Sequence, residues 1–219
     1  MIGKPAPELE VAKWVQGGPV NISALKGRVV LVEVFQVNCP GCFVHALPEV
    51  VHLHQRYEAQ GLAVIGLATA FEDFDKNTLA NLERLIQTGE MIGEPLRQLG
   101  KAGLLQNGRL DYTLPFAVGM DVLSENDAVV DDAAVNTFIH GQLPDFDSWP
   151  DARKQPIYVK ARAYLEAKTH RAHTFESYGL QGTPSSILVD RLGLLREVAF
   201  GYVKPLEPLI SDLLQQAIR

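Results

Sequence analysis

Two cysteines separated by two residues are the part of this sequence best suited to chemistry. Cys39 and Cys42 are the only cysteines among 219 residues, and they follow an apolar run at residues 29–35. A Cys-x-x-Cys pair where a strand ends and a helix begins favours a thiolate, because the helix N-terminus carries partial positive charge and free N–H groups. The spacing also lets a disulfide close and reopen. The pair is therefore predicted to be a redox-active dithiol.

Other uses of a Cys-x-x-Cys pair fit this sequence less well. A zinc ribbon needs a second pair of ligands, and haem attachment needs a histidine directly after the second cysteine, where Phe43 stands. His45 would supply a third metal ligand, but no fourth ligand stands at the usual spacing. A purely structural disulfide would close a very small loop and contribute little chain entropy. We therefore expect neither a bound metal nor a cofactor.

The composition argues against several classes of partner for the cysteine pair. The chain has a net charge of −6 and no basic cluster, which argues against nucleic acid and anionic membrane surfaces as partners. No run of about 18 or more apolar residues exists, so no membrane span is expected. Residues 1–7 lack a signal-peptide core, so the chain as written is expected in the cytoplasm, or in the periplasm if an export signal was removed.

The order of apolar segments predicts an α/β fold. Residues 28–35 and 62–68 are almost wholly aliphatic, as in buried strands, and residues 42–59 between them have helical spacing, with Pro48 expected to kink the helix. Such a unit has a right-handed crossover and a parallel strand pair. Further strands are expected at 9–15 and 20–22 (as a hairpin), 114–120, 185–190 and 195–200, and further helices at 77–87, 133–139, 157–177 and 208–218.

Four short motifs occur in a fixed order along the chain. They are GKPAP at residues 3–7, LKGRVVLV at 25–32, CPGC at 39–42 and YGLQGTPSSILVD at 178–190. In these motifs the chain resembles the thioredoxin-like family of thiol–disulfide oxidoreductases. It is most similar to the TlpA-type branch, which shares its scaffold with the alkyl hydroperoxide reductase/thiol-specific antioxidant (AhpC/TSA) proteins. The resemblance implies a thioredoxin-like fold, in which helices flank a central mixed sheet.

The resemblance also implies roles for particular residues. Cys39 matches the exposed nucleophilic cysteine and Cys42 the buried resolving one. Pro184 matches a proline that the family holds in cis, facing the disulfide, so the backbone of Thr183 is expected close to the sulfurs. That backbone would pair with an extended substrate segment. Without the other motifs, residues 182–184 would be interpreted as an ordinary turn.

The residues beside the cysteines depart from the family pattern. Asn38 stands where the family usually has tryptophan, and with Pro40 and Gly41 it is expected to form a small polar rim that contacts substrate. His45 falls where TlpA-type reductases can carry an acid. A protonated His45 would lower the pKa of the thiols, and the alternative is a solvated helix residue with no such effect.

Glu33 interrupts an otherwise apolar strand six residues before Cys39. In thioredoxins, an acid at this position lies beneath the active site and moves protons to and from the buried cysteine. Burial should raise its pKa, which suits a proton acceptor near neutral pH. The alternative is an edge-facing or salt-bridged carboxylate, because carboxylates are rarely buried without a partner.

The segment from about residue 72 to 173 is much longer than the helix and strand that fill this interval in compact family members. We expect one thioredoxin-like domain over residues 1–219, with 72–173 as a largely helical insertion. This segment would either cap the site or form a dimer surface that restricts partners, or it would pack on the sheet edge without such a role. The sequence gives no indication of the oligomeric state.

Together these features predict thiol–disulfide exchange with protein or small-molecule disulfides and dithiols. In this mechanism Cys39 attacks the substrate disulfide, and Cys42 resolves the mixed disulfide that forms. Glu33 takes the proton from Cys42. Two other functions stay open. A thiol peroxidase of the antioxidant branch would resemble Pro-x-x-x-Thr-x-x-Cys, but Val32 and Gln36 occupy the proline and threonine positions. The scaffold can also serve as a binding module without catalysis.

Overall fold

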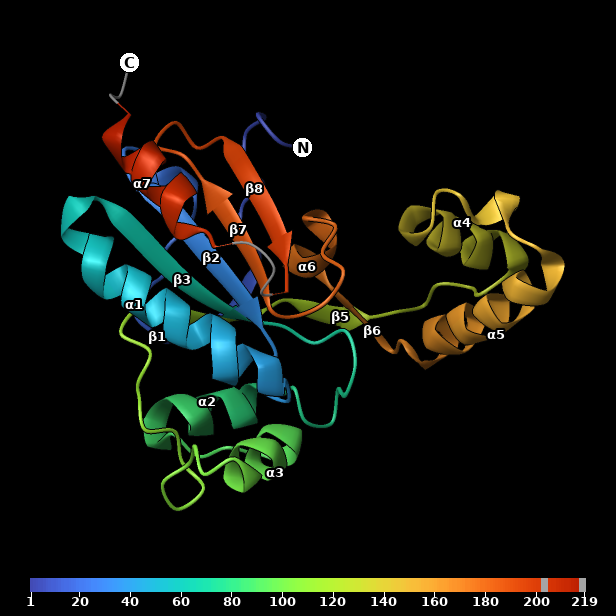
Figure 1. Ribbon diagram of the computed structural model, residues 1–219, viewed down its shortest axis with the longest axis horizontal. Coiled ribbons are helices and arrows are strands. Elements are labelled where there is room, and N and C mark those ends of the chain that lie inside the picture. Colours follow the sequence, from blue (N-terminus) through green and yellow to red (C-terminus); the bar gives the residue numbers. More distant parts are fainter. Residues whose placement is uncertain (202–204, 217–219) are drawn as a thin grey trace. The chain divides into compact units, whose positions relative to one another are not determined.

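A six-stranded mixed sheet lies at the centre of the unit that holds the cysteines (Figure 1). The cysteine pair follows the end of one of its central strands. The computed structural model describes residues 1–201 and 205–216. The strand order is β1-β4-β3-β2-β7-β8, with β2 antiparallel to β7 and parallel to β3. The strands are β1 (Val11–Gln16), β2 (Val29–Phe35), β3 (Leu62–Ala68), β4 (Ala117–Asp121), β7 (Ser185–Val189) and β8 (Leu195–Phe200). The sheet with its flanking helices is the thioredoxin-like fold that the motifs predicted.

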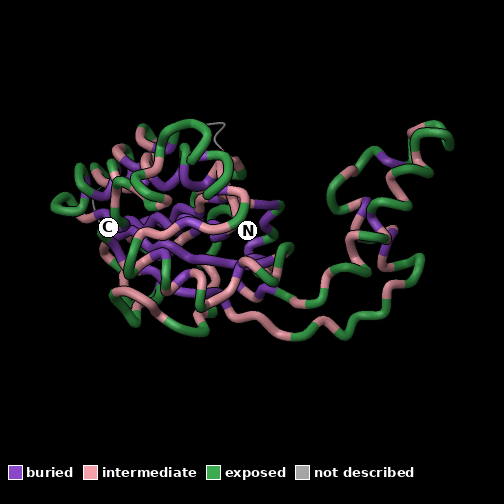
Figure 2. Tube along the Cα trace, turned by 90° about the horizontal axis from the view of Figure 1, so that it is seen from below, coloured by how far each residue is buried: buried purple, intermediate pink, exposed green. Residues whose placement is uncertain are grey.

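The two central strands pair in parallel, as their aliphatic composition predicted. The register runs from Val29 opposite Leu62 to Phe35 opposite Ala68, and every residue of both strands is buried. Successive side chains of a strand point to opposite faces, so alternate residues of β2 enter two different cores. Figure 2 shows the buried residues concentrated along these strands. A strand buried on both faces needs cover on both, which explains the unbroken apolar run.

Helices cover the two faces of the sheet. Side chains of α1 (Leu47–Tyr57), α2 (Leu79–Thr88) and α7 (Glu207–Gln215) share a core with one face. Phe175 of α6 (His173–Ser177) belongs to the core on the other face. The C-terminal helix was predicted at 208–218, of which residues 217–218 lie outside the described residues.

The helix that follows the cysteines begins with a wide turn. A π-helical segment, η2 (Cys42–Ala46), precedes α1, and the Leu47 N–H donates to the carbonyl oxygen of Cys42, five residues back. Pro48 has no N–H to donate, and its ring would clash with the carbonyl group four residues earlier. The wide turn accommodates this proline without ending the helix.

The predicted hairpin of residues 9–15 with 20–22 is wrong. β1 pairs antiparallel with β4, and residues 20–22 lead into a short 3₁₀ helix, η1 (Ser23–Leu25). Pro19 cannot donate a hydrogen bond to a strand ladder, which disfavours a strand immediately after the turn. β4, more than a hundred residues away in sequence, supplies the partner for β1.

The structure divides the expected 72–173 segment between two compact units. The first unit comprises Met1–Leu123 and Ala172–Arg219, and the second comprises Ser124–Arg171. Three elements from the first part of the segment thus belong to the unit that holds the sheet: α2, α3 (Gly93–Lys101) and β4. Of these, α3 was not predicted from the sequence.

The second unit is built mainly from two helices, α4 (Asp132–Gln142) and α5 (Asp151–Ala167). Its small core consists of Val135, Ile139, Phe146 and Ala161. The predicted helix at 157–177 is broken, because α5 ends at Ala167 and the short strand β6 (His170–Ala172) pairs with β5 (Leu123–Glu125) before α6. No helix in residues 1–201 or 205–216 has the length and apolar character that crossing a lipid bilayer requires.

Candidate active site

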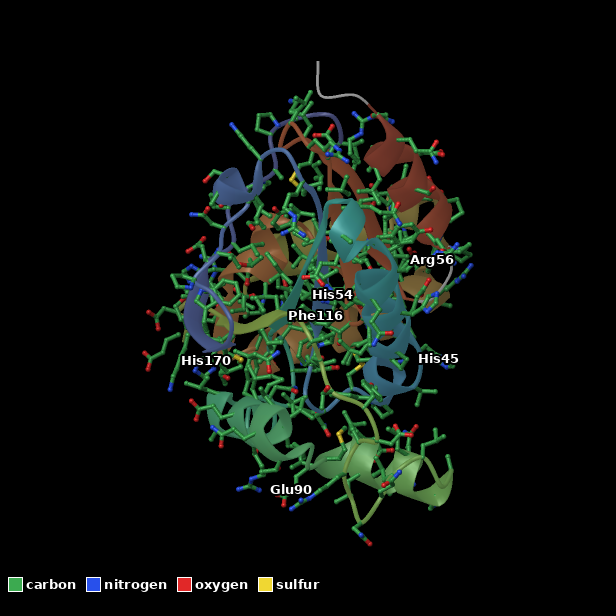
Figure 3. The ribbon with its side chains drawn as sticks, turned by 90° about the vertical axis from the view of Figure 1, so that its left-hand side faces the viewer. His45, His54, Arg56, Glu90, Phe116 and His170 are labelled. Carbon is green, nitrogen blue, oxygen red and sulfur yellow. A yellow bond between two sulfur atoms is a disulfide. The ribbon has the colours of Figure 1, made fainter. Side chains whose placement is uncertain are left out.

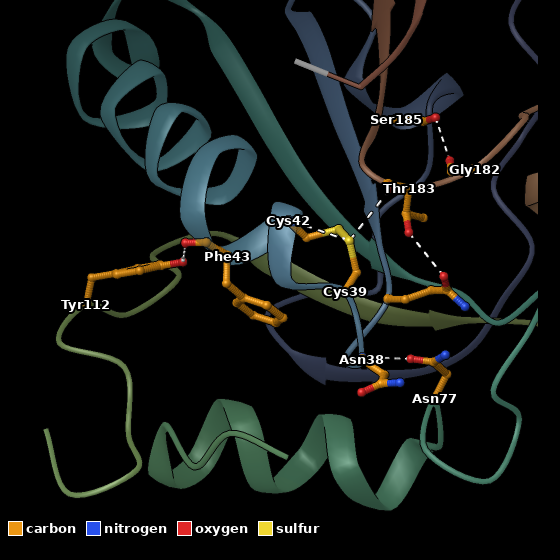
Figure 4. Close-up of a disulfide and its surroundings, with 10 residues drawn as sticks. Asn38, Cys39, Cys42, Phe43, Asn77, Tyr112, Gly182, Thr183 and Ser185 are labelled. Carbon is orange, nitrogen blue, oxygen red and sulfur yellow. Dashed lines mark hydrogen bonds between the residues drawn. A yellow bond between two sulfur atoms is a disulfide. The ribbon is translucent and has the colours of Figure 1, made fainter. Parts of the chain in front are cut away.

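The two cysteines are joined in a disulfide between the end of β2 and the start of the active-site helix (Figure 4). Their Cα atoms are 5.5 Å apart. Cys42 is fully buried and Cys39 is half-buried, so an incoming sulfur reaches Cys39 more readily. The backbone N–H of Cys42 points at the Cys39 Sγ at 3.3 Å. When the disulfide opens, this N–H stabilises negative charge on Cys39.

The chain segment before β7 faces the disulfide. The Thr183–Pro184 peptide bond is cis, and the carbonyl oxygen of Thr183 lies 3.6 Å from the Cys39 Sγ. Both Thr183 and Pro184 are half-buried. The structure thus brings together residues 144 positions apart, as the resemblance implied, while the role of Thr183 in substrate binding stays a prediction.

Gln36 is a part of the site that the sequence analysis did not assign. It is 3% exposed and immediately follows β2. The Thr183 hydroxyl donates to Gln36 Oε1 at 3.1 Å, and Gln36 Nε2 donates to the carbonyl oxygen of Glu72 at 3.2 Å. Gln36 therefore holds the Thr183 side chain in place beside the disulfide. A polar residue at the end of an apolar strand was the signal for it in the sequence.

Asn38 is a structural tether as well as a neighbour of Cys39. Its backbone N–H donates to Asn77 Oδ1 at 2.8 Å (Figure 4). Its side-chain Nδ2 donates to Asp73 Oδ2 at 2.7 Å, and its Oδ1 accepts from the Glu94 N–H at 2.8 Å, in the first turn of α3. Asn38 thus joins the cysteine loop to the loop before α2 and to α3. Its predicted contact with substrate remains untested, as do those of Pro40 and Gly41, which are half-buried between the cysteines.

Replacing Asn38 by alanine is expected to lower the free energy of unfolding of the oxidised protein by about 1–3 kcal/mol, because two side-chain hydrogen bonds are lost in a half-buried position. It is also expected to change the rate at which dithiothreitol opens the disulfide. Asn21→Ala is the control, since Asn21 also makes two hydrogen bonds, in an exposed turn. Urea unfolding and reduction kinetics check this. Equal effects of both substitutions would contradict a tether at the site.

Tyr112 supports the wide turn after the cysteines. Its hydroxyl donates to the carbonyl oxygen of Phe43 at 3.0 Å (Figure 4). A π-helical turn lacks the regular hydrogen-bond pattern, so a side-chain donor satisfies a carbonyl group there. Burial raises the pKa of Tyr112, so this hydroxyl keeps its proton. Because Tyr112 lies outside every motif, the sequence offered no signal for it.

Glu33 belongs to β2, and its side chain is fully buried between the sheet and the active-site helix. The Ser186 hydroxyl donates to Glu33 Oε2 at 2.6 Å, while Oε1 has no hydrogen-bond partner within the described part of the chain. Burial raises the pKa of Glu33 to about 8, against the opposing effect of the Ser186 hydrogen bond. The carboxyl group is therefore mostly protonated at neutral pH. The alternative of an edge-facing or salt-bridged Glu33 does not fit this environment.

His45 is exposed on the π-helical turn, three residues beyond Cys42 (Figure 3). Its predicted effect on the thiol pKa stays a prediction. Within residues 1–201 and 205–216, no three His, Cys, Asp or Glu side chains are grouped so that they could hold a metal ion.

A large cavity of about 850 Å³ lies at the other end of the central strands. Its walls include Arg28, directly before β2, Leu62, which begins β3, and His54 near the end of α1. The His54 ring meets Phe116 edge-on, with centroids 5.7 Å apart (Figure 3). The cysteines lie at the opposite end of β2 and at the opposite end of the helix, so this cavity is not part of the redox site.

Parts of the sequence match a known protein family and known proteins. Residues 1–91 match the Redoxin family model. The chain is 36% identical over 75 residues to the protein DipZ of Mycobacterium tuberculosis, an alignment that covers 32% of this chain and 11% of DipZ. It is 31% identical over 71 residues to the protein FixW of Rhizobium leguminosarum, covering 32% of this chain and 31% of FixW. The chain thus matches only a minor part of these relatives.

Solved structures match along nearly the whole chain. A thiol-disulfide isomerase from Corynebacterium glutamicum is 26% identical, with a TM-score of 0.59 and 97% of each chain covered. A thioredoxin-like superfamily protein, SPOA0173, shares the fold at 24% identity, with the same TM-score and 98% of each chain covered. These matches show that the chain has the thioredoxin-like fold, and that its residues 1–91, which include the Cys39–Cys42 disulfide, are similar to the Redoxin family.

Proposed function

We propose that this protein exchanges disulfides with its substrates through Cys39 and Cys42, with Cys39 as the attacking sulfur. The observation that carries the proposal is the difference in accessibility between the two cysteines. Cys39 is partly accessible, beside the Cys42 N–H and the Thr183 carbonyl group, whereas Cys42 is fully buried. An accessible sulfur can meet a substrate, and a buried one can react only within the protein.

The proposed reaction has two exchange steps. The Cys39 thiolate attacks a substrate disulfide, forming a bond to one substrate sulfur while the other leaves as a thiolate and takes up a proton. Glu33 first loses its proton, its carboxylate then takes the proton of Cys42, and the Cys42 sulfur attacks Cys39. The internal disulfide forms, and the second substrate sulfur leaves. In the opposite direction the protonated Glu33 returns the proton to Cys42 as the disulfide opens, which suits a pKa of about 8.

Substrate binding is proposed at the loop before β7. The backbone of Thr183 lies beside Cys39 and can pair with an extended segment of a protein substrate. Phe200, which ends β8, is 51% exposed, and a Cβ at Gly182 would lie 2.5 Å from its ring. An exposed aromatic side chain beside Gly182 offers apolar surface to residues flanking the substrate cysteine. The site therefore suits a disulfide in an extended protein segment, which would contact Cys39 and the surfaces beside it. A small disulfide would contact only Cys39.

Reduction of insulin by dithiothreitol tests the proposal. The wild-type protein is expected to accelerate precipitation of the insulin B chain, and Cys39→Ser is expected to give the rate of dithiothreitol alone. A wild-type protein no faster than Cys39→Ser would contradict the exchange activity and favour a binding module. Peroxide consumption that survives Cys42→Ser would instead favour a peroxidase. The reduction potential of the Cys39–Cys42 pair shows whether the protein reduces or oxidises its substrates. A value of about −270 mV indicates a reductant, and one of about −120 mV indicates an oxidant.

A further inference from the structure

Glu33 is sealed from solvent, with 0% of its surface exposed. If it serves Cys42 as proposed above, it must gain and lose a proton in every cycle. A proton cannot pass through an apolar core without polar groups or water to carry it. The following inference rests on the proposed function and concerns the route by which this proton reaches the surface.

A small cavity adjoins Glu33 between the sheet and the active-site helix. It is lined by Glu33 and Ser186 from the strands and by Ala46, Glu49 and Val50 from the helix. Its volume of about 20 Å³ is enough for one water molecule. The Oε1 atom of Glu33, which no described group hydrogen-bonds, belongs to a side chain in this wall. A buried carboxyl oxygen and a water-sized space therefore lie together.

Glu49 lines the same cavity and is half-buried at the start of α1, so it borders both the cavity and the surface. We propose that Glu49 carries protons between solvent and Glu33, across the small cavity that both residues line. The two groups also interact electrostatically, because charge on Glu49 raises the pKa of Glu33.

The charged groups around Glu49 suit a group that gains and loses protons. Burial raises the pKa of Glu49, the negative charge of Glu207 on α7 raises it further, and His52 on its own helix lowers it. Glu207 itself accepts a hydrogen bond from the Tyr57 hydroxyl at 2.9 Å and pairs with Arg56 at 3.1 Å. Glu49 therefore keeps a proton at higher pH than an exposed glutamate does.

The proton steps balance as follows. When the disulfide opens, Glu33 gives its proton to the Cys42 sulfur and becomes a carboxylate. Water in the cavity passes a proton to Glu33 and takes one from the carboxyl group of Glu49, which is then protonated again from solvent. When the disulfide closes, the same transfers run in reverse. Over the whole cycle Cys42, Glu33 and Glu49 return to their starting protonation states, while the dithiol that opens the disulfide gives up two protons and the disulfide that the protein reduces takes up two.

Glu49→Gln tests this route, with Glu58→Gln as the matched control. Glu58 directly follows α1 and carries the same charge, but it is exposed and does not line the cavity. Opening of the oxidised protein by excess dithiothreitol and closing of the reduced protein by oxidised dithiothreitol are followed by quenching, alkylation and mass spectrometry. At pH 7 we expect Glu49→Gln to slow both reactions by about tenfold, below the 10²–10⁴-fold typical of a direct acid–base group.

A proton route changes the rates of opening and closing by the same factor, so the reduction potential of Glu49→Gln should equal that of the wild type. We also expect Glu49→Asp, which retains a carboxyl group, to be faster than Glu49→Gln, and added formate to accelerate Glu49→Gln but not Glu58→Gln. Rates for Glu49→Gln within twofold of the wild type would overturn the inference while leaving the exchange activity intact. So would a slowing of one direction alone. A wild type without insulin reduction would instead overturn the proposed function.

Discussion

Replacing Cys42 with serine is expected to leave the protein joined to its substrate by a stable mixed disulfide at Cys39. In the proposed mechanism Cys42 is the sulfur that completes the exchange, because it is buried and is joined to Cys39 in the disulfide. Without it, the first step proceeds and the second has no nucleophile. Mass spectrometry after incubation with an oxidised peptide should show an adduct of one peptide chain per protein. Turnover in the insulin assay should fall to the background rate of dithiothreitol.

Cys39→Ser is the matched control, since it also leaves a single thiol in the same turn. It should form little adduct, because the remaining Cys42 is fully buried. Equal adduct formation by the two variants would mean that both sulfurs are accessible in the reduced protein. Adduct only on Cys42 would reverse the assigned roles. Either result would contradict the asymmetry on which the proposed function rests.

The central strands and the cysteine turn could be predicted from the sequence because their signals are local. Residues 29–35 are apolar throughout except for Glu33, and such a composition at this length is typical of a strand buried on both faces. The cysteines, two residues apart, can bond across the first turn of the following helix. Each of these features needs only neighbouring residues for its interpretation.

The contacts that complete the site could not be predicted, because they join distant segments. Asn38 bonds to Asn77 and to Glu94, and Thr183 bonds to Gln36, across 39, 56 and 147 positions of the sequence. Polar residues of this kind are common in loops, and nothing in their local spacing selects the partner. The substrate contact of Asn38 that the sequence suggested stays a prediction, and nothing in the sequence indicated the tether that the structure shows.

The middle of the chain was predicted less well for a related reason. α3 is short, begins with Gly93 and Pro95 in its first turn, and buries only Pro95 and Leu99, so few apolar residues mark it as a helix in the sequence. The break between α5 and α6 depends on pairing of β6 with β5, about fifty residues earlier in the chain. Helical periodicity along one segment cannot show such a partner. For the same reason, the division after Leu123 could not be placed from the sequence.

Glu33→Gln is expected to remove most of a strong pH dependence of stability. Burial raises the pKa of Glu33 from 4.5 to about 8, so the folded protein binds one more proton than the unfolded chain between these values. The contribution of protonated Glu33 is complete below pH 4.5 and is lost as the pH rises toward 8. In this window the free energy of unfolding of the wild type should fall by about 1.4 kcal/mol per pH unit relative to Glu33→Gln.

Urea unfolding of the oxidised proteins at pH 5, 6.5 and 8 measures this difference. Other buried acids with raised pKa values, such as Asp121, are present in both proteins, so their effects cancel when the two curves are subtracted. Glu58→Gln should run parallel to the wild type, because Glu58 is exposed. If Glu33→Gln also ran parallel to the wild type, Glu33 would hold no extra proton in the fold. It could then not supply one to Cys42 when the disulfide opens at neutral pH.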